Sequence, residues 1–118
     1  MTATFLTRLA IPGLALAGLM QTAAAPSTRG MDIVEHGNAN GAPACQLCHG
    51  AGLEGNPALK APALAGLPAA TVPARLAHYA GADGHNPTMR EVATALDPSE
   101  RAAVANYIAS LPKAAATH

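Results

Sequence analysis

The chain has 118 residues, which is enough for one domain. Seven Lys and Arg residues balance seven Asp and Glu residues, so the formal net charge is zero and a nucleic-acid partner is not indicated. Half of the residues are apolar, but with one Phe, two Tyr and no Trp the aromatic side chains cannot supply a normal core, and another apolar body must fill its centre.

Residues 1–24 are predicted to be a secretory signal peptide. Arg8 supplies a positive n-region, an apolar stretch follows, and small residues around Ala24 offer a cleavage site. We favour a cut after Ala24 over one that would leave Pro26 directly behind it. The alternative is an uncleaved membrane anchor, but the apolar run is short for a span and Pro12-Gly13 interrupts it. The sequence therefore predicts export to the periplasm.

The next segment is a short predicted helix, Gly30 to His36, which stops at Gly37. A loop leads from it to Cys45-Gln46-Leu47-Cys48-His49. Residues spaced i, i+3 and i+4 share one face of a helical turn, so both thiols and the imidazole are expected to point the same way. The two sulfurs can bond to the vinyl groups of a haem and the histidine can ligate its iron. This spacing is typical of covalent c-type haem attachment.

Other interpretations of the two cysteines fit less well. A thioredoxin-like redox pair belongs in a βαβ pattern, which is absent from the sequence. A closed zinc site usually has a second CxxC pair, and the chain has no further cysteine. A disulfide between positions so close together would close a very small loop and add little stability.

The rest of the chain is also predicted to be helical. Prolines through residues 53–73 favour an extended loop, and a helix then runs from Thr71 or Val72 to Gly81. After a loop at 82–88, apolar residues recur at helical spacing: Met89, Val92, Ala93 and Leu96. Asp97-Pro98-Ser99-Glu100 predicts a capped start for a last helix that ends at Pro112, and 113–118 is expected to be a flexible tail. We expect an all-α fold of four to five short helices.

A second axial ligand would make the iron six-coordinate. Beyond the signal segment the only methionines are Met31, which suits core packing, and Met89, which follows a Gly/Asn/Pro loop. A thioether ligand raises the reduction potential relative to a second histidine. Met89 is the favoured candidate, and His85 on the same loop is the alternative.

With these residues the chain resembles class I cytochromes c, in particular small bacterial periplasmic members and the cytochrome subunits of bacterial dehydrogenases. The resemblance covers roughly residues 30–111 and lies in four segments: CQLCHG (45–50), APALAG (61–66), NPTM (86–89) and VANYIASL (104–111).

The resemblance implies a small cytochrome c fold in residues 25–112, built around one covalently bound haem c. Cys45, Cys48 and His49 would bind the haem, and Met89 would be the second iron ligand. The carbonyl of Pro62 would accept a hydrogen bond from His49. First and last helices would cross with Gly30 against Tyr107.

Two positions depart from the family pattern. The aromatic residue usual three positions after the crossing glycine is Ile33 here. Many relatives have an arginine five residues before the axial methionine, near a haem propionate, and this chain has Gly84 there.

We therefore expect a periplasmic single-haem electron carrier, not an enzyme, whose iron cycles between Fe(III) and Fe(II). Its partners would be redox proteins (a dehydrogenase, an oxidase or other cytochromes), without stable membrane insertion after signal cleavage. The alternative is a dedicated cytochrome c subunit of a periplasmic oxidoreductase complex. The low charge permits this alternative, because freely diffusing carriers often have a strong charge asymmetry that steers them to their partners. A haem enzyme or gas sensor would need an open axial position.

Overall fold

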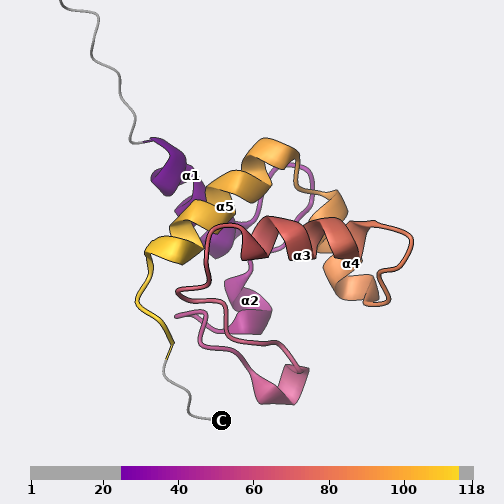
Figure 1. Cartoon of the computed structure of the whole chain (residues 1–118), viewed down its shortest axis with the longest axis horizontal. Coiled ribbons are helices and arrows are strands. Elements are labelled where there is room, and N and C mark those ends of the chain that lie inside the picture. Colours follow the sequence, from indigo (N-terminus) through magenta and orange to yellow (C-terminus); the bar gives the residue numbers. More distant parts are fainter. Residues whose placement is uncertain (1–24, 115–118) are drawn as a thin grey trace, which may run out of the picture.

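The computed structural model describes residues 25–114, and within this range the chain is helical and contains no β-strand (Figure 1). Asn56 and Ala61 form an isolated antiparallel bridge. The expected all-α fold is confirmed. In chain order the elements are α1 (Ala25–His36), α2 (Gln46–His49), the 3-10 helix η2 (Pro57–Leu59), α3 (Thr71–Ala80), α4 (Pro87–Thr94) and α5 (Pro98–Ser110).

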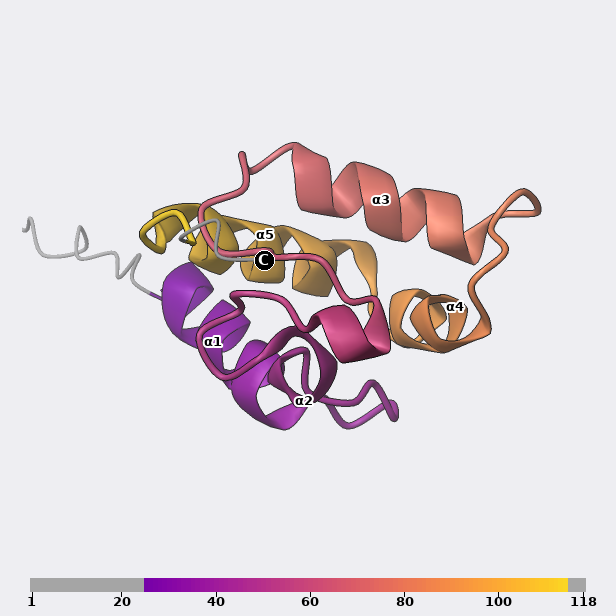
Figure 2. The same ribbon diagram turned by 90° about the horizontal axis from the view of Figure 1, so that it is seen from below.

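The first and last helices cross at Gly30, and α1 lies against α5 in both views (Figure 1, Figure 2). A Cβ atom at Gly30 would meet the backbone carbonyl of Ala103 and would lie 2.8 Å from Cβ of Tyr107. Only a residue without a side chain permits this approach. Ile33 is 4% exposed in the core, so the crossing forms with an aliphatic residue at that position. The predicted crossing is confirmed.

Helix α1 begins at Ala25, five residues earlier than expected. The sequence offers a physical reason, because a proline at position 26 falls in the first turn, where a missing N–H costs no intrahelical hydrogen bond.

A capping box begins α5, as predicted. The carboxylate of Asp97 accepts a hydrogen bond from the N–H of Glu100 at 2.8 Å, and the carboxylate of Glu100 accepts one from the N–H of Asp97 at 3.0 Å. Glu100 is buried and also accepts from Nδ2 of Asn38 at 3.1 Å and pairs with Arg29 at 3.5 Å. This carboxylate therefore connects α5 to α1 and to the loop that follows α1.

Helix α3 packs against α4 and α5, and its buried residues are Val72 and Leu76. Helix α4 begins at Pro87, two residues before the first expected helical position. Asn86 caps the helix, since its Oδ1 accepts a hydrogen bond from the N–H of Met89 at 3.0 Å, and Pro87 follows at the first helical position. The loop between α3 and α4 is correspondingly shorter than predicted.

The proline-rich segment between α2 and α3 has no long helix among its residues, as its composition predicted, and contains one short helix, η2, which was not predicted. The carbonyl of Leu53 accepts hydrogen bonds from the N–H groups of Leu64 (2.8 Å) and Ala65 (3.1 Å), which closes the segment into a loop. Leu53 is 1% exposed and lies in the core. The loop therefore contributes apolar surface to the same core as the helices.

Among residues 25–114 no aromatic side chain is fully buried, and the largest fully buried ones are Leu53, Ile108, Val34 and Val104. After α5, the N–H of Ala114 donates a hydrogen bond to the carbonyl of Ala65 at 3.4 Å. The predicted signal segment 1–24 and residues 115–118 of the predicted tail lie outside the described residues. Among the described helices, none has the length and apolar character that a bilayer crossing requires.

Candidate cofactor site

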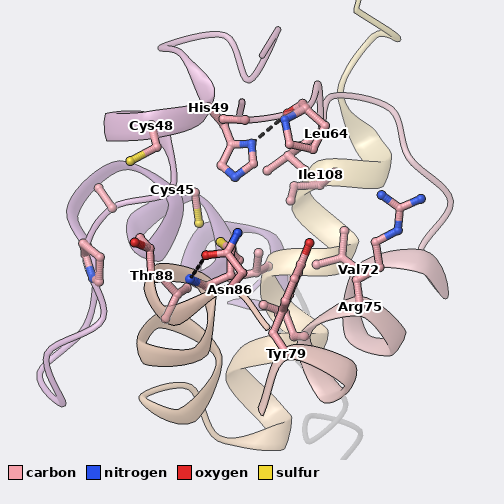
Figure 3. Close-up of a pocket in the computed structure, with 18 of the residues that line it drawn as sticks. Cys45, Cys48, His49, Leu64, Val72, Arg75, Tyr79, Asn86, Thr88 and Ile108 are labelled. Atoms are coloured by element: carbon pink, nitrogen blue, oxygen red, sulfur yellow. Dashed lines mark hydrogen bonds between the residues drawn. The ribbon is translucent and has the colours of Figure 1, made fainter. Parts of the chain in front are cut away.

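The short helix α2 places two thiols and an imidazole at one position in the fold. The N–H groups of Cys48 and His49 donate to the carbonyl of Cys45 at 3.3 and 3.0 Å, so the turn is helical as the spacing predicted. It ends at Gly50, whose φ of +94° favours glycine. Both cysteines are free thiols; Cys45 is partly buried and Cys48 is exposed. Figure 3 shows the sulfur of Cys45 and the ring of His49 directed into the same pocket.

The imidazole of His49 is buried and is oriented by a backbone carbonyl. Its Nδ1 lies 2.7 Å from the carbonyl oxygen of Pro62, as drawn in Figure 3. A carbonyl only accepts, so Nδ1 carries the proton and donates. Nε2 then keeps its lone pair and is the nitrogen available to a metal, because the hydrogen bond at one ring nitrogen sets the tautomer.

His49 lines a pocket of about 300 Å³. Its volume is at the lower end of the roughly 300–1,000 Å³ typical of small-molecule sites. Most of its lining is aliphatic and comes from the loop after α2 and from α3, α4 and α5. These apolar residues are Leu59, Leu64, Leu67, Val72, Leu76, Val92, Leu96, Val104 and Ile108.

The wall opposite His49 is formed by the start of α4. Asn86 and Thr88 face the histidine across the pocket in Figure 3, and Met89 is the next pocket-lining residue. Met89 is half-buried, and its backbone is held by the cap at Asn86. His85 is exposed, and neither His85 nor Met31 is among the residues that line the pocket. The structure therefore brings Cys45, Cys48, His49, Pro62 and Met89 to one pocket.

Gly84, the second departure from the family pattern, has no room for a side chain. A Cβ atom there would lie 2.6 Å from the carbonyl oxygen of Tyr79 and 2.8 Å from that of His78. The loop is therefore packed directly onto the end of α3, and an arginine at this position would require another path for the backbone.

The charges at the pocket favour a ligand with negative groups. Arg75 and Lys60 line it, and none of the described lining residues is acidic. Burial raises the pKa of the Cys45 thiol to about 11, so this group is protonated at neutral pH.

These features fit a covalently attached haem. Two sulfurs and a free imidazole nitrogen occupy one wall, a thioether residue lies on the facing segment, and the aliphatic lining suits a flat apolar ring. The two cations suit its propionates.

The sequence pattern did not reveal the capping role of Asn86. The Asn-Pro pair that indicated a turn is also a helix start signal, with a cap residue followed by proline at the first position. The orientation of the Tyr79 side chain toward the pocket, visible in Figure 3, was also not predicted.

Comparison with known proteins identifies related sequences. The family model "Cytochrome c" matches residues 34–112. A relative from Stutzerimonas stutzeri (strain A1501), named thiosulfate dehydrogenase electron acceptor, is 35% identical over 98 residues, which cover 82% of this chain and 45% of the relative. A relative of the same name from Thiomonas intermedia (strain K12) is 39% identical over 70 residues, covering 59% and 32%. The chain thus spans less than half the length of these curated relatives.

Solved structures give a consistent result. Thiosulfate dehydrogenase (TsdBA) from Marichromatium purpuratum superposes with a TM-score of 0.74 at 34% identity, over 79% of this chain and 20% of that one. Reduced recombinant cytochrome c4 from Pseudomonas stutzeri superposes with a TM-score of 0.67 at 30% identity, over 75% of this chain and 49% of that one.

Proposed function

The chain belongs to the cytochrome c family, and on that basis we propose that it is a periplasmic single-haem electron carrier. The family carries haem c bound covalently, and a domain of this size accommodates one. When bound, this haem supplies a one-electron Fe(III)/Fe(II) couple, and no substrate bond is made or broken.

The chain's own residues attach and orient this group. Cys45 and Cys48 would hold the haem through two thioether bonds, and His49 would ligate its iron through Nε2. The carbonyl of Pro62 fixes the orientation of the ring through the 2.7 Å hydrogen bond and raises the basicity of Nε2. Met89 would supply the second iron ligand through its sulfur. The aliphatic lining would exclude water from most of the bound ring, and the bonds at Pro62 and Asn86 would hold His49 and the backbone of Met89 in place.

The observation that carries the proposal is the convergence of these five residues on one apolar pocket. The five come from three segments that are separated along the chain: α2 with its N-cap, the proline-rich loop and α4. A pocket with an axial candidate on each of two facing walls suits a closed six-coordinate site, which is the arrangement for electron transfer rather than for binding a gas or peroxide.

Absorption spectra of three variants test the axial assignment. We expect the ferric wild-type protein to show a methionine-to-iron charge-transfer band, which Met89→Ala abolishes. His85→Ala and the matched methionine control Met31→Ala should keep the band, because neither residue lines the pocket. Absence of the band from the wild-type protein, or its retention in Met89→Ala, would contradict the assignment.

The second candidate is a dedicated cytochrome subunit of a periplasmic oxidoreductase, with a thiosulfate dehydrogenase as the electron donor. Both curated relatives are named as electron acceptors of that enzyme, and the chain superposes on part of such an enzyme. Native periplasmic extract distinguishes the candidates, since a subunit elutes with a large catalytic partner and a free carrier elutes at the size of the monomer. A second measurement tests the proposed donor. A thiosulfate dehydrogenase and thiosulfate should together reduce the purified ferric protein, and failure of this reduction removes the enzyme as donor.

A further inference from the structure

The guanidinium group of Arg90 joins the start of α4 to the end of α3. Its Nη2 donates to the carbonyl oxygens of Gly81 and Gly84, both at 2.9 Å, and its Nη1 lies 3.4 Å from the carbonyl oxygen of Ala80. The side chain is half-buried. A single residue of α4 therefore holds the beginning and the middle of the loop, residues 81–86, that joins α3 to α4.

Two of the three carbonyls that Arg90 contacts, those of Ala80 and Gly81, lie at the end of α3, where a helix leaves such groups without intrahelical partners. The last carbonyls of a helix are unpaired and carry partial negative charge, so a guanidinium there forms charge-assisted hydrogen bonds. The planar fork of arginine can reach two carbonyls at once, which a lysine ammonium cannot do with the same geometry. Gly84 is packed too closely on Tyr79 for a side chain of its own to anchor the loop.

Met89 immediately precedes Arg90 in the first two turns of α4. Its N–H is held by Asn86, the last residue of the same loop, at 3.0 Å. Displacement of the loop from α3 would therefore move the cap residue and the methionine with it. We propose that Arg90 is a positioning residue for Met89, and that its hydrogen bonds set how rarely the sulfur leaves the pocket and opens the iron to an external ligand. This inference rests on the proposed role of Met89 as an axial ligand.

Arg101 is a matched control within the chain. Its Nε donates to the carbonyl of Leu96 at 3.1 Å and its Nη2 to the carbonyl of Ala93 at 2.7 Å, so it also joins backbone carbonyls at the end of a helix. It is likewise half-buried. Its contacts are at the carboxyl end of α4, on the carbonyls of Ala93 and Leu96, and none of them reaches the loop between α3 and α4.

The experiment is a titration of the ferric holoprotein with imidazole, followed by absorbance, for Arg90→Lys, Arg90→Gln and Arg101→Gln. Imidazole binds only when Met89 has left, so its apparent affinity reports the population of the open state. We expect Arg90→Gln to bind imidazole at least about tenfold more tightly than the wild type. The variant loses hydrogen bonds to a charged group, which raises the population of the open state. Arg90→Lys should lie between the two, and Met89→Ala should set the limit of a fully open site.

Thermal unfolding of the same proteins separates positioning from stability. Arg101→Gln should lower the melting temperature but change the imidazole affinity by less than about twofold to threefold, because its hydrogen bonds leave the loop before Met89 untouched. An unchanged affinity in both Arg90 variants, or an equal increase in Arg101→Gln, would overturn the proposal. If Met89→Ala instead binds imidazole as the wild type does, the axial assignment has failed, and the role of Arg90 fails with it. If Arg90→Gln does not fold, the Arg90→Lys affinity decides the question alone.

Discussion

The residues around the buried histidine constrain one another through backbone as well as side-chain atoms. Gly55 donates its N–H to the carbonyl of His49 at 2.7 Å, and its φ is +94°. A Cβ atom there would lie 2.8 Å from the nitrogen of Ala63 and 3.1 Å from the carbonyl carbon of Pro62. The position of the carbonyl that orients His49 thus depends on the absence of a side chain at a neighbouring residue.

The change Gly55→Ala tests this dependence, with Gly41→Ala as its control. Gly41 has a similar φ of +97°, but a Cβ atom there would have no neighbour within 4 Å. Gly41→Ala should therefore cost only the left-handed conformation, about 1–2 kcal/mol of unfolding free energy. Gly55→Ala should cost more, because the clash adds to the same conformational term. Denaturant unfolding measures both, and equal losses would contradict this account of the Pro62 segment.

Glu100 is the second residue with an outsized structural role. Its replacement by alanine removes the acceptor of the Asp97 N–H and one of the two acceptors of the Asn38 amide, which keeps its bond to the carbonyl of Ala95. We expect a loss of roughly 2–3 kcal/mol of unfolding free energy. Glu91→Ala on the exposed face of α4 should change it by less than about 0.5 kcal/mol. A loss for Glu100→Ala as small as that of the control would show that the network contributes little.

The sequence predicted these residues unequally. Cys45, Cys48 and His49 are predictable because their geometry is local, set by the period of one helical turn. The contacts of Arg90 and Asn38 join positions brought together by folding, and no short-range pattern marks a side chain whose partners are backbone carbonyls. Such residues are found only when the path of the chain is known.

At the scale of helices, the crossing of α1 and α5 depends on Gly30. In an exposed helix, Gly→Ala stabilises by about 1 kcal/mol through helix propensity. Here the added methyl group meets the carbonyl of Ala103, so we expect Gly30→Ala to destabilise the protein by about 3 kcal/mol. Asp32→Ala on the exposed side of α1 is the control and should be nearly neutral. Unfolding that is unchanged by Gly30→Ala would mean that the two helices do not approach this closely.

The start of α5 has a predictable pH dependence. Hydrogen bonds from the N–H of Glu100 and the hydroxyl of Ser99 lower the pKa of Asp97 below its ordinary value of 3.8. A carboxyl whose pKa is lower in the folded state stabilises the fold above 3.8, and this contribution is lost as the pH falls through the folded-state pKa. Asp97→Asn keeps a capping oxygen but does not titrate. The stability difference between wild type and Asp97→Asn should therefore shrink between pH 5 and pH 2 in thermal unfolding, and a constant difference would contradict the shift.

Helix ends were harder to predict than helix identities. The capped start of α5 was predicted because Asp97 and Glu100 form a local signal. The start of α4 was missed by two residues because Asn86-Pro87 was interpreted as a turn, although a turn and a helix cap share the same residues.

At the scale of the whole molecule, the composition and the architecture have one explanation. Short helices rich in alanine bury little area each, and the fully buried side chains are aliphatic. The pocket between α2, the proline-rich loop and α4 is where the missing apolar volume belongs, and the family to which the chain belongs fills it with haem c. The chain aligns with less than half of each curated relative, which is consistent with its containing one such haem domain.

Intact mass is the most direct measurement of the central claim. The protein should be produced in a bacterium that attaches haem in its periplasm, purified from there, and weighed under denaturing and reducing conditions. We predict the mass of residues 25–118 plus one haem, and a Cys45→Ala/Cys48→Ala variant that has lost the haem. A folded wild-type protein with the mass of the bare polypeptide would contradict the account.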